Sequence, residues 1–151
     1  MYKLEVIPHR CLIQTWPYVE KLFSRIVKAS PDEITLEGIQ GRLLDKSEFL
    51  AVVMREGDPG PPIAAFTFGF ATVDTGKKFL GVTTLAGHEA PEWLEEIVKQ
   101  LVIIAQAENC YEVRALGCRR GWAKMVDKAL LKGQPGTERY TLKFNIEGIR
   151  L

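Results

Sequence analysis

The part of the chain that most restricts its fold is a set of three strand-like runs within residues 49–85. The runs extend from Phe49 to Met54, from Ile63 to Val73 and from Lys78 to Leu85, with the apolar spacing of β-strands. Residues 57–62, Gly-Asp-Pro-Gly-Pro-Pro, cannot continue a sheet ladder, and residues 74–77, Asp-Thr-Gly-Lys, read as a second turn. Because connections this short join neighbouring antiparallel strands, the sequence predicts a meander.

Helical patterns and a further strand precede this meander. A short strand from Tyr2 to Ile7 leads to a helix expected from about Trp16 to Ala29, with Pro17 in its first turn. The segment Ser30-Pro31-Asp32-Glu33 has the residues of a capping box. It therefore predicts the start of a second helix, which runs to about Leu44.

The chain after the meander adds a crossover. Residues from Pro91 to about Glu108 form the longest helical pattern, apolar on more than one face. The strand from Tyr111 to Leu116 follows within a few residues, so we expect it to lie parallel to the strand before the helix. A last helix is expected from about Trp122 to Leu131, and a final strand from Arg139 to Ile146.

Taken together, these elements predict an α/β (α+β) fold in the order β-α-α-β-β-β-α-β-α-β. The central sheet is expected to be mixed, with the antiparallel meander and one parallel crossover. A length of 151 residues fits one domain over residues 1–151, and no linker or internal repeat interrupts it.

Composition excludes several classes of partner and site. Lys plus Arg number 20 and Asp plus Glu 19, so a net charge of +1 gives no overall attraction to nucleic acid or membranes. No apolar stretch reaches the roughly 20 residues of a membrane span, and the N-terminus lacks the regions of a signal peptide, so a cytoplasmic protein is expected. Cys11, Cys110 and Cys118 contain no C-x-x-C spacing. We therefore predict reduced thiols and no metal site.

Four segments of the second half form a distinctive string: F-L-G-V-T-T-L-A-G at residues 79–87, W-L at 93–94, N-C-Y-E-V-R at 109–114 and G-C-R-R-G-W-A-K-M at 117–125. With the order of elements, they resemble the GCN5-related N-acetyltransferase (GNAT) fold over nearly the whole chain. Within that fold they are similar to GNAT-like proteins of unknown activity from tailed bacteriophages and prophages, of the internal virion protein type. Cys118 stands where that group usually has arginine.

The resemblance implies a cofactor loop between the fourth strand and the long helix. Active members of the fold carry R/Q-x-x-G-x-G/A there, whose backbone N–H groups contact the pyrophosphate of acetyl-CoA. In this chain only Gly87 is permissive, Pro91 has no N–H, and Glu89 and Glu92 bring carboxylates to the loop. We therefore predict that no cofactor binds. If acetyl-CoA does bind, the resemblance assigns its contacts to Leu85, Ala86 and Gly87.

Catalytic residues are scarce in the places where the resemblance implies them. Many members of the family use a glutamate on the meander as a base and a tyrosine on the last helix as an acid. Residues 79–85 contain no carboxylate, and residues 122–131 contain no tyrosine. His88 with Glu89 beside it, and Tyr111 on the next strand, are weak candidates for acid–base roles. A loop histidine is more often solvated and a strand tyrosine more often packed.

Basic residues gather between positions 114 and 128, where Trp122 is the only aromatic residue. Base stacking would need more aromatic side chains, so nucleic acid is disfavoured. An acidic protein partner or a solvated face fits the pattern better. The candidate interaction residues are Arg119, Arg120, Trp122 and Lys124.

Three functions stay open, because a fold does not determine an activity. The favoured one is a phage or prophage protein with a degenerate acetyl-CoA site, acting through protein contacts as a virion-associated or assembly component. It would be found in the host cytoplasm or in the virion. The alternative is an acetyl-CoA-dependent N-acetyltransferase with an atypical cofactor loop that modifies a host protein. The third is an inhibitor of host defence, and the oligomeric state is left open.

Overall fold

The structure, a computed structural model, describes residues 1–88, 90–115, 134–135 and 142–151. They divide into two compact units, a first unit of Met1–Phe68 with Thr84–Glu89 and a second unit of Gly69–Thr83 with Ala90–Leu151. The elements in chain order are β1 (Tyr2–Val6), η1 (His9–Cys11), α1 (Leu12–Ala29), α2 (Leu36–Leu44), β2 (Phe49–Arg55), β3 (Ala64–Thr72), β4 (Lys78–Gly87), α3 (Ala90–Ala107), β5 (Cys110–Ala115), β6 (Gln134–Pro135) and β7 (Leu142–Asn145).

The strands pair in the order β1-β2-β3-β4-β5-β7-β6. β1 is antiparallel to β2, with Tyr2 opposite Arg55, and β2 is antiparallel to β3. β4 and β5 are parallel, with Leu80 opposite Val113. The predicted mixed sheet, with antiparallel neighbours and one parallel crossover, is therefore confirmed. The assignment of residues 1–151 to one domain stays a prediction.

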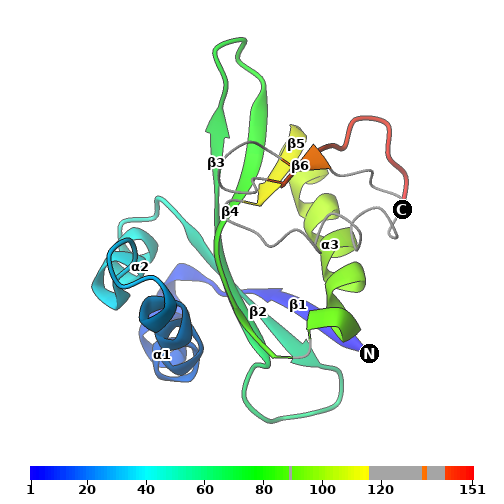
Figure 1. Cartoon of the computed structure of the whole chain (residues 1–151). Helices are drawn as coiled ribbons and strands as arrows, with labels where there is room; N and C mark the ends of the chain where they lie inside the picture. The colour runs from blue at the N-terminus through cyan, green and yellow to red at the C-terminus, as the bar shows by residue number, and fades with distance from the viewer. Residues whose placement is uncertain (89, 116–133, 136–141) are drawn as a thin grey trace. The chain divides into compact units, whose positions relative to one another are not determined.

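In the first unit, α1 and α2 pack beside one another and share a core with β2 (Figure 1). Val19 and Phe23 of α1 and Ile39 of α2 are completely buried, and they belong to the same cluster as Leu50 of β2. Burying each such side chain stabilises the fold by about 1.5–3 kcal/mol. The apolar face of each helix therefore fixes it on the sheet.

The start of α1 differs from the prediction. The helix begins at Leu12, before the expected Trp16, so Pro17 lies inside it and not in its first turn. A proline in the interior removes one backbone hydrogen bond. The buried stripe of α1 includes Leu12, Val19, Leu22 and Phe23, and this packing holds the first turns in place despite the lost bond.

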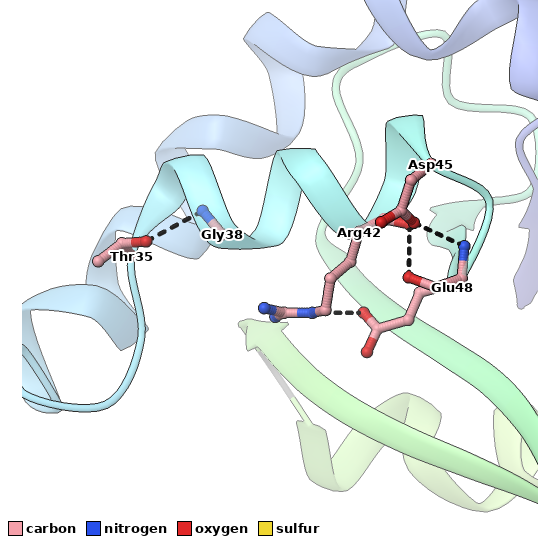
Figure 2. A network of polar contacts seen from close by, with 6 residues as sticks. Thr35, Gly38, Arg42, Asp45 and Glu48 are labelled. Carbon is pink, nitrogen blue, oxygen red and sulfur yellow. Dashed lines mark hydrogen bonds and ion pairs between the residues drawn. The ribbon is translucent and has the colours of Figure 1, made fainter.

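The start of α2 also differs from the prediction, and the capping box at Ser30 was wrong. Ser30 ends α1 through its N–H, which donates to Ile26 O, and its carbonyl accepts the N–H of Glu33. The N-cap of α2 is Thr35, whose Oγ1 accepts a hydrogen bond from the Gly38 N–H at 2.9 Å (Figure 2). Both residues fit the sequence rule for a cap, but only Thr35 has the extended backbone that an N-cap needs.

In the second unit, α3 packs against β5 (Figure 1). Gln106 of α3 donates from Nε2 to the carbonyl oxygens of Ile146 and Ile149, at 3.1 and 2.8 Å, so the helix is also bonded to the segment after β7. β7 is antiparallel to β5. The buried residues of α3 are Trp93, Leu94, Ile97, Val98, Leu101, Val102 and Ala105.

The C-terminal third is described only in part. β6 at Gln134–Pro135 pairs with β7, and it lies between the helix and the strand that the sequence predicted for this region. The predicted helix at Trp122–Leu131 and the first residues of the predicted strand at Arg139–Ile146 lie outside the described residues. Within the described part of the chain, no helix combines the length and hydropathy needed to span a bilayer.

Candidate functional site

The predicted cofactor loop starts at the end of β4, where Gly87 lies tightly against the start of β3. A Cβ atom at Gly87 would lie 2.3 Å from the Cβ of Ala64, 2.6 Å from its Cα and 2.8 Å from the carbonyl oxygen of Ile63. Non-bonded carbon atoms normally stay about 3.5–4.0 Å apart, so a side chain does not fit there. The packing of the two strands therefore requires glycine at this position, with or without a phosphate nearby.

The backbone N–H of His88, the residue after Gly87, is already engaged in a hydrogen bond. The N–H of His88 donates to Ile63 O at 3.0 Å, which continues the contact between the two segments. A pyrophosphate is held by several backbone N–H groups that point at it from a loop and a helix start. Since the N–H of His88 is occupied and Pro91 has none, the loop offers fewer donors than the pattern of active family members.

The side chain of His88 meets an arginine from a distant part of the chain. Arg25 of α1 donates from Nη1 to Nδ1 of His88 at 2.9 Å, and both side chains are exposed. Because a guanidinium only donates, Nδ1 acts as the acceptor, and the neutral ring carries its proton on Nε2. The lone pair that a general base would use is therefore occupied, whereas the guanidinium places a positive charge next to the loop. The sequence offered no signal for Arg25, which lies 63 positions before His88.

The other candidate residues of the loop differ in their burial and in their position in the fold. Ala86 is 6% exposed and belongs to the core shared by α1, α2 and β2, so only its backbone could meet a ligand. Leu85 is half-buried. Glu92 lies in the first turn of α3, where a carboxylate favours the helix start. Glu89 lies outside the described residues.

Tyr111 lies in a cluster of the second unit at the β4–β5 pairing. Its hydroxyl accepts a hydrogen bond from Nη2 of Arg114 at 3.3 Å, and Nζ of Lys77 lies 5.2 Å from the centre of its ring. Arg114 also bonds Glu112 and covers the ring of Phe79 at 4.0 Å. The structure therefore engages Tyr111 in packing and hydrogen bonding within the second unit.

Arg114 is held firmly in this cluster. Burial acts to lower the pKa of Arg114, but the hydrogen bonds from the guanidinium to Glu112 and Tyr111 outweigh burial, so the pKa lies above its usual value. The pair also neutralises Glu112, a carboxylate opposite Phe79 in the β4–β5 register. Glu112 is thus an ion-pair partner and is not a free base.

The remaining predicted residues add no site among the described residues. Cys110 is buried, and burial raises the pKa of its thiol, whereas Cys11 is half-buried. No group of three potential metal ligands occurs in the described ranges. The four candidate interaction residues, Arg119, Arg120, Trp122 and Lys124, lie outside them, as does Cys118.

Solved acetyltransferase structures share this arrangement of elements. An acetyltransferase from Trypanosoma brucei superposes with a TM-score of 0.63 at 12% identity, covering 92% of this chain and 98% of that one. The glucosamine-6-phosphate N-acetyltransferase of Arabidopsis thaliana gives 0.62 at 12% identity, over 91% and 96%. The chain has the GNAT fold.

A GNAT-fold neighbour with its cofactor adds a further comparison. A predicted acetyltransferase with acetyl-CoA from Clostridium acetobutylicum gives a TM-score of 0.55 at 11% identity, covering 85% of this chain and 88% of that one. Identities this low show the fold alone. No protein-family model matches the sequence, and no curated protein matches it either.

Proposed function

We propose that this GNAT-fold chain acts through protein contacts and does not transfer acetyl groups. The main observation behind the proposal is that the first residues of the predicted cofactor loop are already packed and hydrogen-bonded to the start of β3. Gly87 is packed on Ala64, and the N–H of His88 is bonded to Ile63 O. The N–H of His88 is therefore not available to a pyrophosphate, and Pro91 has no N–H to offer.

Two further observations support the absence of acetyl transfer. β4 carries no carboxylate to take a proton from an amine, and the nearby Glu112 is paired with Arg114. The lone pair on Nδ1 of His88 accepts a bond from Arg25. General base catalysis requires an unoccupied lone pair within reach of the amine proton, and these residues do not offer one.

Isothermal titration of the purified chain with acetyl-CoA tests this proposal. We expect no saturable heat up to millimolar ligand, whereas the Arabidopsis thaliana N-acetyltransferase, titrated in the same buffer, serves as the positive control. Saturable binding at micromolar concentration would contradict the proposal. The stability of the chain in the same buffer is checked by its thermal melting, so that an unfolded sample is not mistaken for a non-binding one.

The contacts that we propose are those of a phage or prophage component that is virion-associated or takes part in assembly. The resemblance of residues 117–125 supports this, and the proposed contact residues are Arg119, Arg120, Trp122 and Lys124. Mass spectrometry of purified particles should then detect the chain. Reversing the charge of Arg119 and Arg120 should remove it from the particles, whereas reversing Lys3 should not. A chain found only on host proteins in pull-downs would favour an inhibitor of host defence.

A second function, acetyl-CoA-dependent N-acetyltransfer, is favoured by one observation. The guanidinium of Arg25 lies beside the loop at His88 and could meet a phosphate, an interaction for which arginine is well suited. The test is transfer from labelled acetyl-CoA to proteins of a host lysate. If transfer occurs, Arg25→Ala should weaken acetyl-CoA binding roughly 10–100-fold, the effect of one charge-assisted contact. Absence of transfer at every pH tried would exclude this function.

A further inference from the structure

A hollow of about 390 Å³ opens in the first unit, and it shares no lining residue with the end of β4. It forms where the end of β1, η1, the start of α1, the turn after α2 and the start of β2 meet. Small-molecule sites commonly enclose about 300–1,000 Å³ and have mostly apolar walls. The walls include Ile7, Leu12, Leu43, Lys46, Phe49 and Leu50.

The apolar side chains that line the hollow include both buried and exposed ones. Leu43 and Leu50 are each 1% exposed, whereas Val6 and Phe49 keep 39% and 41% of their surface exposed. Removing exposed apolar surface from water lowers the free energy, and this gain does not require a particular orientation of the bound molecule. An apolar body in the hollow would therefore cover Val6 and Phe49 while it rests on the buried leucines.

Three residues with ionisable side chains line the hollow: His9, Lys46 and Glu48. Glu48 is buried, and its Oε2 accepts a bond from Nε of Arg42 at 3.2 Å, so its charge is matched (Figure 2). Nε2 of His9 lies 3.0 Å from Leu44 O and donates to it. Among the described residues, Lys46 has no ion-pair partner. Lys46 is therefore the lining cation that a bound anion can pair with, since the Asp45 carboxylate beside it in the chain accepts the Ser47 N–H.

The backbone at Lys46 supports a role for this side chain. Lys46 has a φ of 66°, in the left-handed region that follows many helices and is usually filled by glycine or asparagine. The chain places asparagine in the same conformation after α3, where Asn109 has a φ of 59°. The turn is held by the Asp45 carboxylate, which accepts the Ser47 N–H at 2.8 Å (Figure 2). A lysine in a conformation that disfavours it points to a role beyond the turn.

From the volume, the apolar walls and the side chain of Lys46, we propose that the hollow binds a small organic monoanion. Its hydrocarbon or aromatic body lies against Leu43, Leu50 and Phe49, and its carboxylate or sulfonate is paired with Nζ of Lys46. This proposal does not depend on whether acetyl-CoA binds at the end of β4.

Fluorescence titration of the full chain with 1-anilinonaphthalene-8-sulfonate tests the proposal. N-phenyl-1-naphthylamine serves as an uncharged probe of similar shape, and decanoate serves as a non-aromatic competitor. We expect saturable 1:1 binding of the sulfonate and its displacement by decanoate. Phe49→Ala should weaken both probes alike, because it removes apolar wall and no charge.

The decisive variant is Lys46→Gly, which changes binding and stability in opposite directions. It should weaken the sulfonate probe at least about tenfold, leave the uncharged probe within about twofold, and raise the Tm by about 2–4 °C. Asn109→Gly is the matched control, because it relieves the same backbone conformation and should leave both affinities unchanged. Lys46→Arg should keep the affinity for the sulfonate.

Several results would overturn the proposal. They are the absence of saturable binding to the native chain, full sulfonate affinity in the Lys46→Gly variant, and equal weakening of both probes by that variant. Analytical ultracentrifugation at the same protein concentrations, which measures the oligomeric state, can give one more such result. A dimer whose formation excludes the probe would assign the hollow to a second copy of the chain.

Discussion

Replacing Gly87 by alanine tests whether strand packing, and not cofactor approach, requires the glycine at the end of β4. The added Cβ would overlap atoms of Ala64 and Ile63, the nearest at 2.3 Å. Reaching normal contact means moving the two segments apart by roughly 1 Å or more. Ala64 is completely buried, and two of the three overlapping atoms belong to the backbone, so rotation of a side chain cannot relieve the overlap.

The expected loss of stability follows from these contacts. Inserting a methyl group into a packed site costs about 1–3 kcal/mol, and weakening the hydrogen bond from His88 to Ile63 adds about 1 kcal/mol. We therefore expect Gly87→Ala to lower the free energy of unfolding by about 3 kcal/mol. This loss should shift the urea midpoint down by about 1–2 M, followed by tryptophan fluorescence, in which the buried Trp93 reports on the core.

Two further variants sharpen this test. Gly41→Ala, at an exposed position of α2 with nothing within 4 Å of the new Cβ, should raise stability by about 1 kcal/mol. Combining Ala64→Gly with Gly87→Ala removes the 2.3 Å contact and keeps the backbone contacts, so the double variant should be less destabilised than the sum of the single ones. A cost below about 1 kcal/mol for Gly87→Ala would refute the packing argument and return the glycine to a role in ligand approach.

Three further outcomes are expected. Thr35→Ala should cost about 1 kcal/mol in urea unfolding, because it removes the N-cap of α2, whereas Ser30→Ala should change stability by no more than about 0.5 kcal/mol. Arg42→Ala should cost about 1–3 kcal/mol, because it leaves the buried Glu48 carboxylate without this partner; a loss under about 0.5 kcal/mol in the same assay would show that water replaces the guanidinium. Burial raises the pKa of Cys110, so the folded chain keeps this proton to higher pH than the unfolded chain. Its contribution is thus present below the unfolded pKa and lost as pH rises through about 8.5, and the fall in stability between pH 7 and 9.5 should be smaller in Cys110→Ala than in the native chain.

Local patterns predicted the elements well but not all of their ends. The strand runs and the long helix at residues 91–108 were found because their periodicity repeats over many residues. The starts of α1 and α2 were wrong. Ser30 and Thr35 both fit the rule for a cap, and only the backbone conformation decides between them. Leu12, the first residue of α1, is buried in the core, and a pattern read from Trp16 onward does not include it.

The sequence alone determined the order of the α-helices and strands from β1 to β5, the antiparallel meander and the parallel crossover, because each follows from short-range periodicity and from loops too short for another connection. The helix expected at Trp122–Leu131 stays a prediction. It also placed an atypical loop after β4. Only the tertiary structure decided what surrounds that loop: Gly87 packs against Ala64, and Arg25 donates a hydrogen bond to His88. It also decided that residues 6–12 and residues 43–50 meet around a separate hollow. These contacts join segments far apart in the chain, and they depend on which surfaces pack together in three dimensions, a relation that no local pattern contains.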